Sequence, residues 1–137
     1  MTVINATKKE FVTLVNGFYA LQNVEGKAFA LKASKNLKIL QTALKDVEVV
    51  GQASPEFIEL AKQVNAIAQE DTAESKAKIE ALEAENEKLL IERQDQISSL
   101  EEMLEADLSL ELDLISKEEL PESITALQIS AIDKIII

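Results

Sequence analysis

Residues 71–107 read DTAESKAKIEALEAENEKLLIERQDQISSLEEMLEAD, and this stretch decides the fold of the chain. It contains no Gly or Pro and is rich in Ala, Leu, Glu, Lys and Gln, which favour helices over other structures. Positions 79, 82, 86, 90, 93, 97, 100 and 104 advance in steps of three and four, so they form one seam along a helix. The spacing predicts a coiled-coil-like helix about 50 Å long, packed against a partner along this seam.

Two members of the seam are polar, Asn86 and Arg93. A polar residue at a core position lowers stability but can fix the register or the partner of a coiled coil. Asn86 would then pair with its symmetry mate in a parallel dimer. Alternatively, both residues mark the part of the seam that is uncovered because shorter helices have ended. Both are candidate partner-contact residues.

The first half of the chain carries clear helix starts. Thr7 and Glu10 form the pattern of a capping box, which predicts a helix that runs to about Gln22. A second helix is expected over about residues 27–47, and the short connection predicts an antiparallel hairpin. Ser54-Pro55 starts a third helix over about 55–69. The sequence permits one unbroken helix over 55–106, but a short break at 70–72 is favoured.

After residue 106 the period changes from helical to alternating. In DLSLELDL, residues 107–114, every second residue is Leu, which predicts a half-buried strand. A strand needs a partner, and three are available: Val3–Ile4, Val49–Val50 or another copy of the chain. Thr125 and Gln128 form another capping-box pattern, which opens a last helix with its apolar residues expected inward; these are Leu127, Ala131, Ile132 and Ile135. The terminal Ile136 and Ile137 either pack into the core or contact a partner.

Charge is unevenly distributed in a chain of net charge −11. Residues 1–50 carry seven Lys against four acidic residues, a net charge of +3, whereas residues 51–137 carry seven basic against twenty-one acidic residues, a net charge of −14. Lys32, Lys35 and Lys38 are candidates for contact with an acidic partner or phosphate, against the simpler explanation that they are solvated or paired within the protein. The acidic half is either a solvated Glu-rich face or an imitation of nucleic-acid phosphates. Direct binding of nucleic acid is not expected.

The chain contains neither Cys nor His, which removes thiolate chemistry, the commonest general base and the commonest transition-metal ligand. Residues 107–113 alternate like the start of an EF-hand, but Leu112 occupies the position that requires Gly. Glu80, Glu83 and Glu87 share a helix face without a His to complete a metal site. We therefore expect no enzyme activity, no cofactor and no bound metal. No signal peptide or membrane span is predicted, so a soluble protein is expected.

Three stretches together resemble a group of small uncharacterised proteins encoded by tailed bacteriophages. They are GKAFALKASKNLKIL (26–40), SPEFIELAKQVNAIAQ (54–69) and ISSLEEMLEADLSLELDLISKEELPESITALQISAID (97–133). In that group a basic helical segment precedes an acidic helical arm, a short β segment and an "LP–x–x–IT" turn into a terminal helix. The resemblance implies a viral origin and a location in the host cytoplasm or the virion. It supplies no activity and no site residues.

The sequence thus predicts a mainly α fold: an antiparallel helical hairpin packed with a long coiled-coil-like helix, plus a small β element near the chain ends. One domain over 1–137 is expected, made of a basic hairpin (1–50), an acidic arm (54–106) and a strand with a terminal helix (107–137). The leading hypothesis is a non-enzymatic protein that acts by protein–protein contact, as an oligomer, an assembly component or a binder of a host protein. Its rivals are an acidic nucleic-acid mimic and a ligand-sequestering inhibitor of a host defence system.

Overall fold

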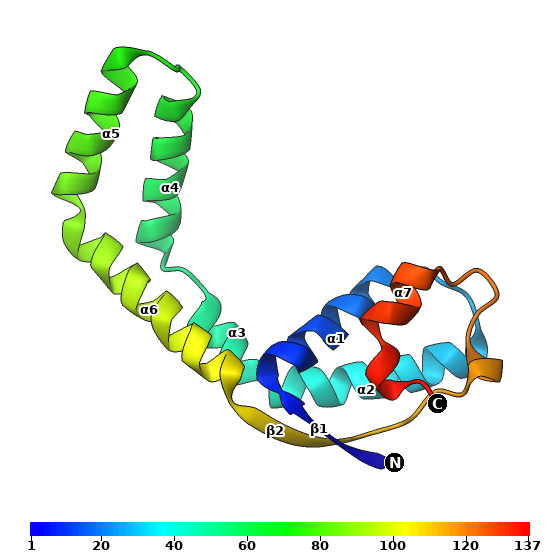
Figure 1. Cartoon of the computed structure of the whole chain (residues 1–137). Helices are drawn as coiled ribbons and strands as arrows, with labels where there is room; N and C mark the ends of the chain where they lie inside the picture. Colours follow the sequence, from blue (N-terminus) through cyan, green and yellow to red (C-terminus); the bar gives the residue numbers. More distant parts are fainter. The chain divides into compact units, whose positions relative to one another are not determined.

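The computed structural model describes all residues, 1–137, and its fold is mainly α with one small antiparallel sheet, which confirms the expected fold class (Figure 1). The elements in chain order are β1 (Thr2–Thr7), α1 (Lys8–Ala20), α2 (Lys27–Ala43), α3 (Lys45–Gly51), α4 (Pro55–Ala68), α5 (Ala73–Glu85), α6 (Glu87–Glu105), β2 (Asp107–Leu112), a 3₁₀ turn at Lys117–Glu119, α7 (Ala126–Ala131) and a second 3₁₀ turn at Asp133–Ile135. None of the helices is long and apolar enough to span a membrane.

The chain divides into two compact units. The first unit combines Met1–Val47 with Glu102–Ile137, and the second consists of Glu48–Glu101. The two ends of the chain therefore build one unit together, and the second unit is inserted between them in sequence. The expectation of a single domain over 1–137 stays a prediction.

The sheet of the first unit joins segments that lie a hundred residues apart in sequence. β1 and β2 pair antiparallel, with Thr2 opposite Leu112, Ile4 opposite Leu110 and Thr7 opposite Asp107. The alternation of Leu in 107–114 therefore predicted a real strand, and of the three expected partners the Val3–Ile4 segment is the one found. Val49 and Val50 lie in α3, so the pairing considered for them is wrong.

The expected hairpin of α1 and α2 encloses the core of the first unit. The predicted capping box is present: the Thr7 hydroxyl accepts from the Glu10 N–H at 3.2 Å, and the Glu10 carboxylate accepts from the Thr7 N–H at 3.3 Å. From there α1 directs one apolar face inward. The fully buried side chains of the unit include Phe11 and Leu14 from α1, Phe29 and Leu40 from α2, and Leu112, Ile115, Ile132 and Ile135 from the chain's last third.

The second predicted helix is shorter than expected. It was expected to reach residue 47, but α2 ends at Ala43 and α3 follows after Leu44. The Leu44 backbone (φ −101°, ψ 11°) turns away from helical geometry while its N–H still donates to the Leu40 carbonyl. Leu44 and Val47 are both buried, so the change of direction keeps both side chains in the core.

The last helix is also shorter than expected. The predicted capping box of Thr125 and Gln128 is present, and Ile132 and Ile135 are buried as expected. Leu127, however, is 85% exposed, so its predicted inward position is wrong. α7 has six residues and packs on α1, where Ala131 and the following Ile132 approach Gly17.

Gly17 lies where α1 and α7 approach closely. A Cβ atom at Gly17 would lie 3.0 Å from the Ala131 Cβ, the Ala131 carbonyl oxygen and the Ile132 Cγ2. Two of these three atoms are a backbone oxygen and a Cβ, which cannot rotate away. The packing of the last helix therefore requires a residue without a side chain at position 17.

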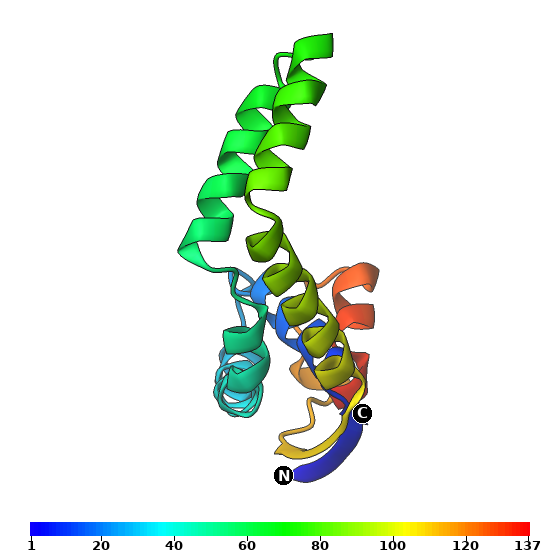
Figure 2. The same cartoon turned by 90° about the vertical axis from the view of Figure 1, so that its left-hand side faces the viewer.

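In the second unit, α4 and α5 lie side by side as an antiparallel hairpin (Figures 1 and 2). The favoured break at 70–72 is confirmed, and the alternative of one helix over 55–106 is wrong. α4 starts at the predicted cap, where the Ser54 hydroxyl accepts from the Phe57 N–H at 3.2 Å. α5 starts at Thr72, whose hydroxyl accepts from the Ser75 N–H at 3.1 Å, and Asp71 adopts a positive φ of 45° in the turn.

The long helix predicted over 72–106 is interrupted once, at Asn86, where the α5 and α6 ribbons meet at a bend (Figure 1). The Asn86 side-chain amide donates to the Leu82 carbonyl at 2.8 Å, in competition with the helix's own backbone hydrogen bonds. The helical pattern resumes at once, since the Leu90 N–H donates to the Asn86 carbonyl at 3.1 Å. The interruption thus occupies a single residue.

We expect Gly17→Ala to destabilise the first unit. Alanine is better than glycine in a helix by about 1 kcal/mol, but overpacking costs about 1–3 kcal/mol, so a net loss of up to about 2 kcal/mol follows. Urea unfolding monitored by circular dichroism measures it. Gly51→Ala is the control, because a Cβ there meets only the Leu100 side chain, at 3.6 Å. Equal stability changes in the two variants would contradict the packing role of Gly17.

Candidate functional site

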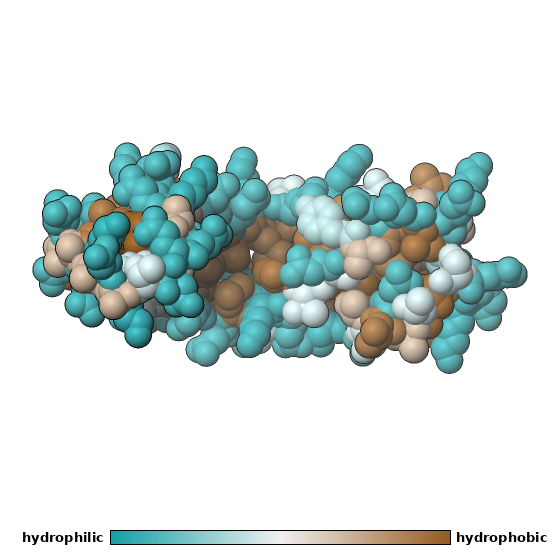
Figure 3. Space-filling model, turned by 90° about the horizontal axis from the view of Figure 1, so that it is seen from above, coloured by the Kyte–Doolittle hydropathy of each residue, from teal (hydrophilic) through white to brown (hydrophobic).

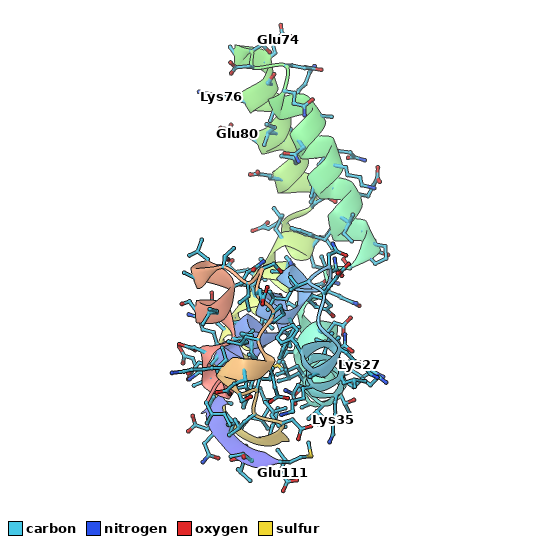
Figure 4. The ribbon with its side chains drawn as sticks, turned by 90° about the vertical axis from the view of Figure 1, so that its right-hand side faces the viewer. Lys27, Lys35, Glu74, Lys76, Glu80 and Glu111 are labelled. Carbon is cyan, nitrogen blue, oxygen red and sulfur yellow. The ribbon has the colours of Figure 1, made fainter.

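Two of the three lysines singled out on α2 are paired within the first unit. Lys32 Nζ donates to the Glu119 carboxylate at 2.7 Å and to the Leu114 carbonyl at 2.9 Å. Lys35 Nζ lies 3.1 Å from Asp113 Oδ2. Lys38 is exposed and forms no ion pair. Figure 4 shows Lys27 and Lys35 extending from α2 at the surface. The structure thus brings Lys32 and Lys35 to the chain after β2, and leaves Lys38 in solvent.

Glu119 is the most perturbed titratable group of the protein. The hydrogen bond from Lys32 lowers the pKa of the Glu119 carboxyl to about 2, and hydrogen bonds from the Ser116 backbone and hydroxyl contribute in the same direction. The Glu119 carboxylate therefore links α2 to the 3₁₀ turn at Lys117–Glu119. Because these contacts hold the 3₁₀ turn against α2, we assign them a structural role.

Asn36 is a residue whose role the sequence analysis missed. It is fully buried on α2. Its Nδ2 donates to the Asp113 carbonyl at 2.9 Å, and its Oδ1 accepts from the Asp113 N–H at 2.8 Å. One amide side chain thus satisfies both backbone groups of a residue that follows β2. Asn36 lies four residues before Leu40, on the apolar side of the helix. This spacing is the sequence signal that could have predicted its burial.

The terminal isoleucines divide between the core and the surface. Ile135 is buried, Ile136 is half-buried and forms a parallel bridge with Ile115, and Ile137 is 65% exposed. The Ile137 N–H donates to the Ile115 carbonyl at 3.0 Å. The backbone of the terminus is therefore held in the first unit, while the Ile137 side chain points outward and stays a candidate for contact.

Arg93 lies in the second unit beside the segment before α4. Its Nη1 donates to the Gln96 side chain at 2.7 Å and to the Gly51 carbonyl at 3.2 Å, and its guanidinium lies 5.6 Å from the centre of the Phe57 ring. Gln96 in turn donates to the Gln52 carbonyl at 2.7 Å. These polar side chains satisfy carbonyl groups at the end of α3 and in the following loop.

Asn86 and Arg93 share one explanation. α4 begins at Pro55, and the Arg93 guanidinium lies over Phe57 in the first turn of α4. Asn86 directly follows α5, the helix that packs against α4. Asn86 bonds to its own helix and Arg93 bonds to the loop before α4. This placement corresponds to the alternative in which polar residues mark the end of the covered seam. Contact of either residue with a partner stays a prediction.

No cluster of three or more acidic residues is placed to hold a metal ion. Comparisons of the chain with protein-family models, with curated proteins and with solved structures found no match. The assignment of function therefore depends on the surfaces themselves.

We expect the loss of stability in acid to depend on Glu119. Its pKa is about 2 in the folded protein against an ordinary value of 4.5, so its contribution to stability is present above pH 4.5 and is lost as the pH falls through about 2. Glu119→Gln should flatten the dependence of the unfolding free energy on pH in this window. Glu118→Gln, at an exposed neighbour without an ion pair, is the control. A Glu119→Gln profile as steep as that of the wild type would contradict this role.

We also expect Asn36→Ala to cost about 1–3 kcal/mol of unfolding free energy, because it leaves the Asp113 N–H and carbonyl without partners. Asn16→Ala provides the matched control, since Asn16 is exposed on α1 and such changes stay within about 0.5 kcal/mol. Chemical denaturation of both variants gives the comparison. A loss no larger in Asn36→Ala than in Asn16→Ala would remove this interaction from the account.

Proposed function

We propose that this is a non-enzymatic protein of tailed bacteriophages that acts by protein–protein contact, either in virion assembly or by binding a host protein. The observation that carries the proposal is the incomplete burial of the seam in the second unit. The resemblance of three stretches of the sequence to small phage proteins supports the viral setting.

The second unit has almost no core of its own. Among residues 48–101, Leu60 is the one buried large apolar side chain. Ile58, Ile91 and Ile97 are 46%, 49% and 41% exposed. The remaining large apolar residues of α4, α5 and α6 in this unit are half-buried, namely Phe57, Val64, Ile67, Ile79, Leu82, Leu89, Leu90 and Leu100. In Figure 3, brown hydrophobic residues are visible between teal hydrophilic ones at the end of the hairpin, on the left of the view.

This exposure favours binding of a further surface. Full burial of a side chain such as Ile or Leu contributes about 1.5–3 kcal/mol, and here most of the large apolar side chains have received only part of that gain. A unit of about fifty residues with one buried large apolar side chain has marginal stability by itself. A partner that covers the seam would therefore stabilise the unit and bind at the same time.

Charge indicates which partner chemistry fits. Residues 48–101 carry thirteen acidic and five basic residues, a net charge of −8. Figure 4 shows Glu74, Lys76 and Glu80 extending outward from α5. A protein surface with an apolar stripe flanked by Lys or Arg is complementary to this hairpin, whereas pairing of two such hairpins must overcome repulsion between like charges.

The same net charge favours a second candidate, an acidic mimic of nucleic acid that inhibits a host defence enzyme. Lys62, Lys76, Lys78 and Lys88 interrupt the acidic surface, which argues against a continuous phosphate-like row. Competition with DNA for a host enzyme distinguishes the candidates, because a mimic would compete strongly at low salt and weakly at high salt.

The test of the leading proposal is site-specific crosslinking in infected cells. A photoreactive amino acid at position 91 or 97 is expected to form a covalent adduct with one protein partner, identified by mass spectrometry, because both side chains are part-exposed apolar residues of the second unit. The control places the same group at Leu127, which is 85% exposed on α7 in the first unit. An adduct at 127 but none at 91 or 97, or no adduct at any position, would contradict the proposal.

A further inference from the structure

The two-stranded sheet has two outer edges, and they differ in chemistry, because the strand at one edge carries charged side chains and the strand at the other carries none. Antiparallel strands direct the N–H and carbonyl groups of alternate residues to the partner strand, and those of the residues between them outward. The Lys8 N–H donates to the Ala106 carbonyl at 2.9 Å. By alternation, Thr2, Ile4 and Ala6 bond to β2, and the backbone groups of Val3, Asn5 and Thr7 point to the outer edge of β1.

The outer edge of β2 is covered or charged. The same alternation directs the backbone groups of Asp113 outward, and there the buried Asn36 side chain binds both of them. Asp107 and Glu111 add negative charge to the outer face of β2, and Figure 4 shows Glu111 pointing away from the helices. Such devices prevent a strand from pairing with another chain.

The outer edge of β1 has no such protection. Its sequence, TVINAT, contains no charge, no Pro and no Gly, and four of its six residues are β-branched, namely Thr2, Val3, Ile4 and Thr7. In Figure 2, β1 lies on the outside of the ribbon. Thr7 is already bonded through its N–H to Glu10. The backbone N–H and carbonyl groups of Val3 and Asn5 are therefore the free ones.

We propose that β1 pairs antiparallel with β1 of a second copy of this chain, with Ile4 opposite Ile4 of the partner. In this register the Val3 N–H and carbonyl meet the Asn5 carbonyl and N–H of the other copy, and the reverse pair follows by symmetry. All free backbone groups of both edges are then bonded. The two sheets become one of four strands, with β1 and its copy at the centre.

Self-complementarity and charge favour a second copy over another protein. The Ile4 side chain is half-buried on the same face as Ala6, and at a non-hydrogen-bonded pair the two Ile4 side chains would approach closely and cover one another. The paired segments are uncharged, so the net charge of −11 on each chain opposes this contact less than it opposes pairing of the acidic hairpins. The contact leaves the second unit available for its own partner.

Solution mass and one proline variant test the pairing. We expect the purified protein to have twice the 15.1 kDa mass of one chain by light scattering or sedimentation. Val3→Pro should be a folded protein of 15.1 kDa whose melting temperature, unlike that of the wild type, does not depend on protein concentration. Val3→Pro removes an outward N–H only. Ile4→Pro, the matched control, removes a bond to β2 and should lower the melting temperature. A monomeric wild type, or a dimer that survives in a folded Val3→Pro variant, would overturn the proposal.

A cysteine variant tests the register independently of any proline effect. The chain has no Cys, so any disulfide formed by a single-Cys variant joins two copies. Ile4→Cys should form a covalent dimer on mild oxidation, because Cα atoms of a directly opposed non-hydrogen-bonded pair lie about 4.5 Å apart. Val3→Cys should not, because Val3 faces Asn5 of the partner. Equal crosslinking of both variants, or a monomeric chain that captures a strand of a different protein through this edge, would overturn the second copy as its occupant.

Discussion

The pairing of Thr2–Thr7 with Asp107–Leu112 is the constraint on which the first unit depends. It joins two segments separated by about a hundred residues, and the entropy of closing so long a loop is offset only if both strands also bury apolar side chains. Leu112 and Ile115 do so, together with Ile132 and Ile135 from the end of the chain. Without this ladder, β1 would have no hydrogen-bonded partner strand, and the segment after residue 106 would be held only by its contacts with α1 and α2.

The two units differ in how completely they satisfy their own apolar residues. The first unit buries four apolar side chains of α1 and α2 to 2% exposure or less, namely Phe11, Leu14, Phe29 and Leu40. Its Asn36 side chain bonds the backbone after β2. The second unit satisfies backbone carbonyl groups with side chains, as Arg93 does at Gly51, but Leu60 is its one buried large apolar residue. The first unit thus buries most of its large apolar residues within itself, and under the function proposed above a partner covers those of the second unit.

Local signals predicted the parts of the fold that depend on neighbouring residues. The caps at Thr7, Ser54 and Thr125 start helices as expected, and the alternating Leu residues form a strand. The changes at Leu44 and Asn86 and the outward position of Leu127 depend on packing against residues distant in sequence, so periodicity alone did not reveal them. The candidate site has the same limit: Lys32 and Lys35 look like a free basic patch in sequence, and only the fold brings Glu119 and Asp113 to them.

The insertion of the second unit between Val47 and Glu102 has an evolutionary consequence. The second unit is joined to the first at two positions in the chain. Another sequence could replace it if these junctions were preserved, because β1, β2, the hairpin of α1 and α2, and the buried Asn36 lie outside residues 48–101. Under the phage function proposed above, a virus selected to recognise a changed target could replace residues 48–101 by recombination, while the first unit changes slowly under selection for folding. The first unit would then be conserved among such viruses, and the inserted helices would vary.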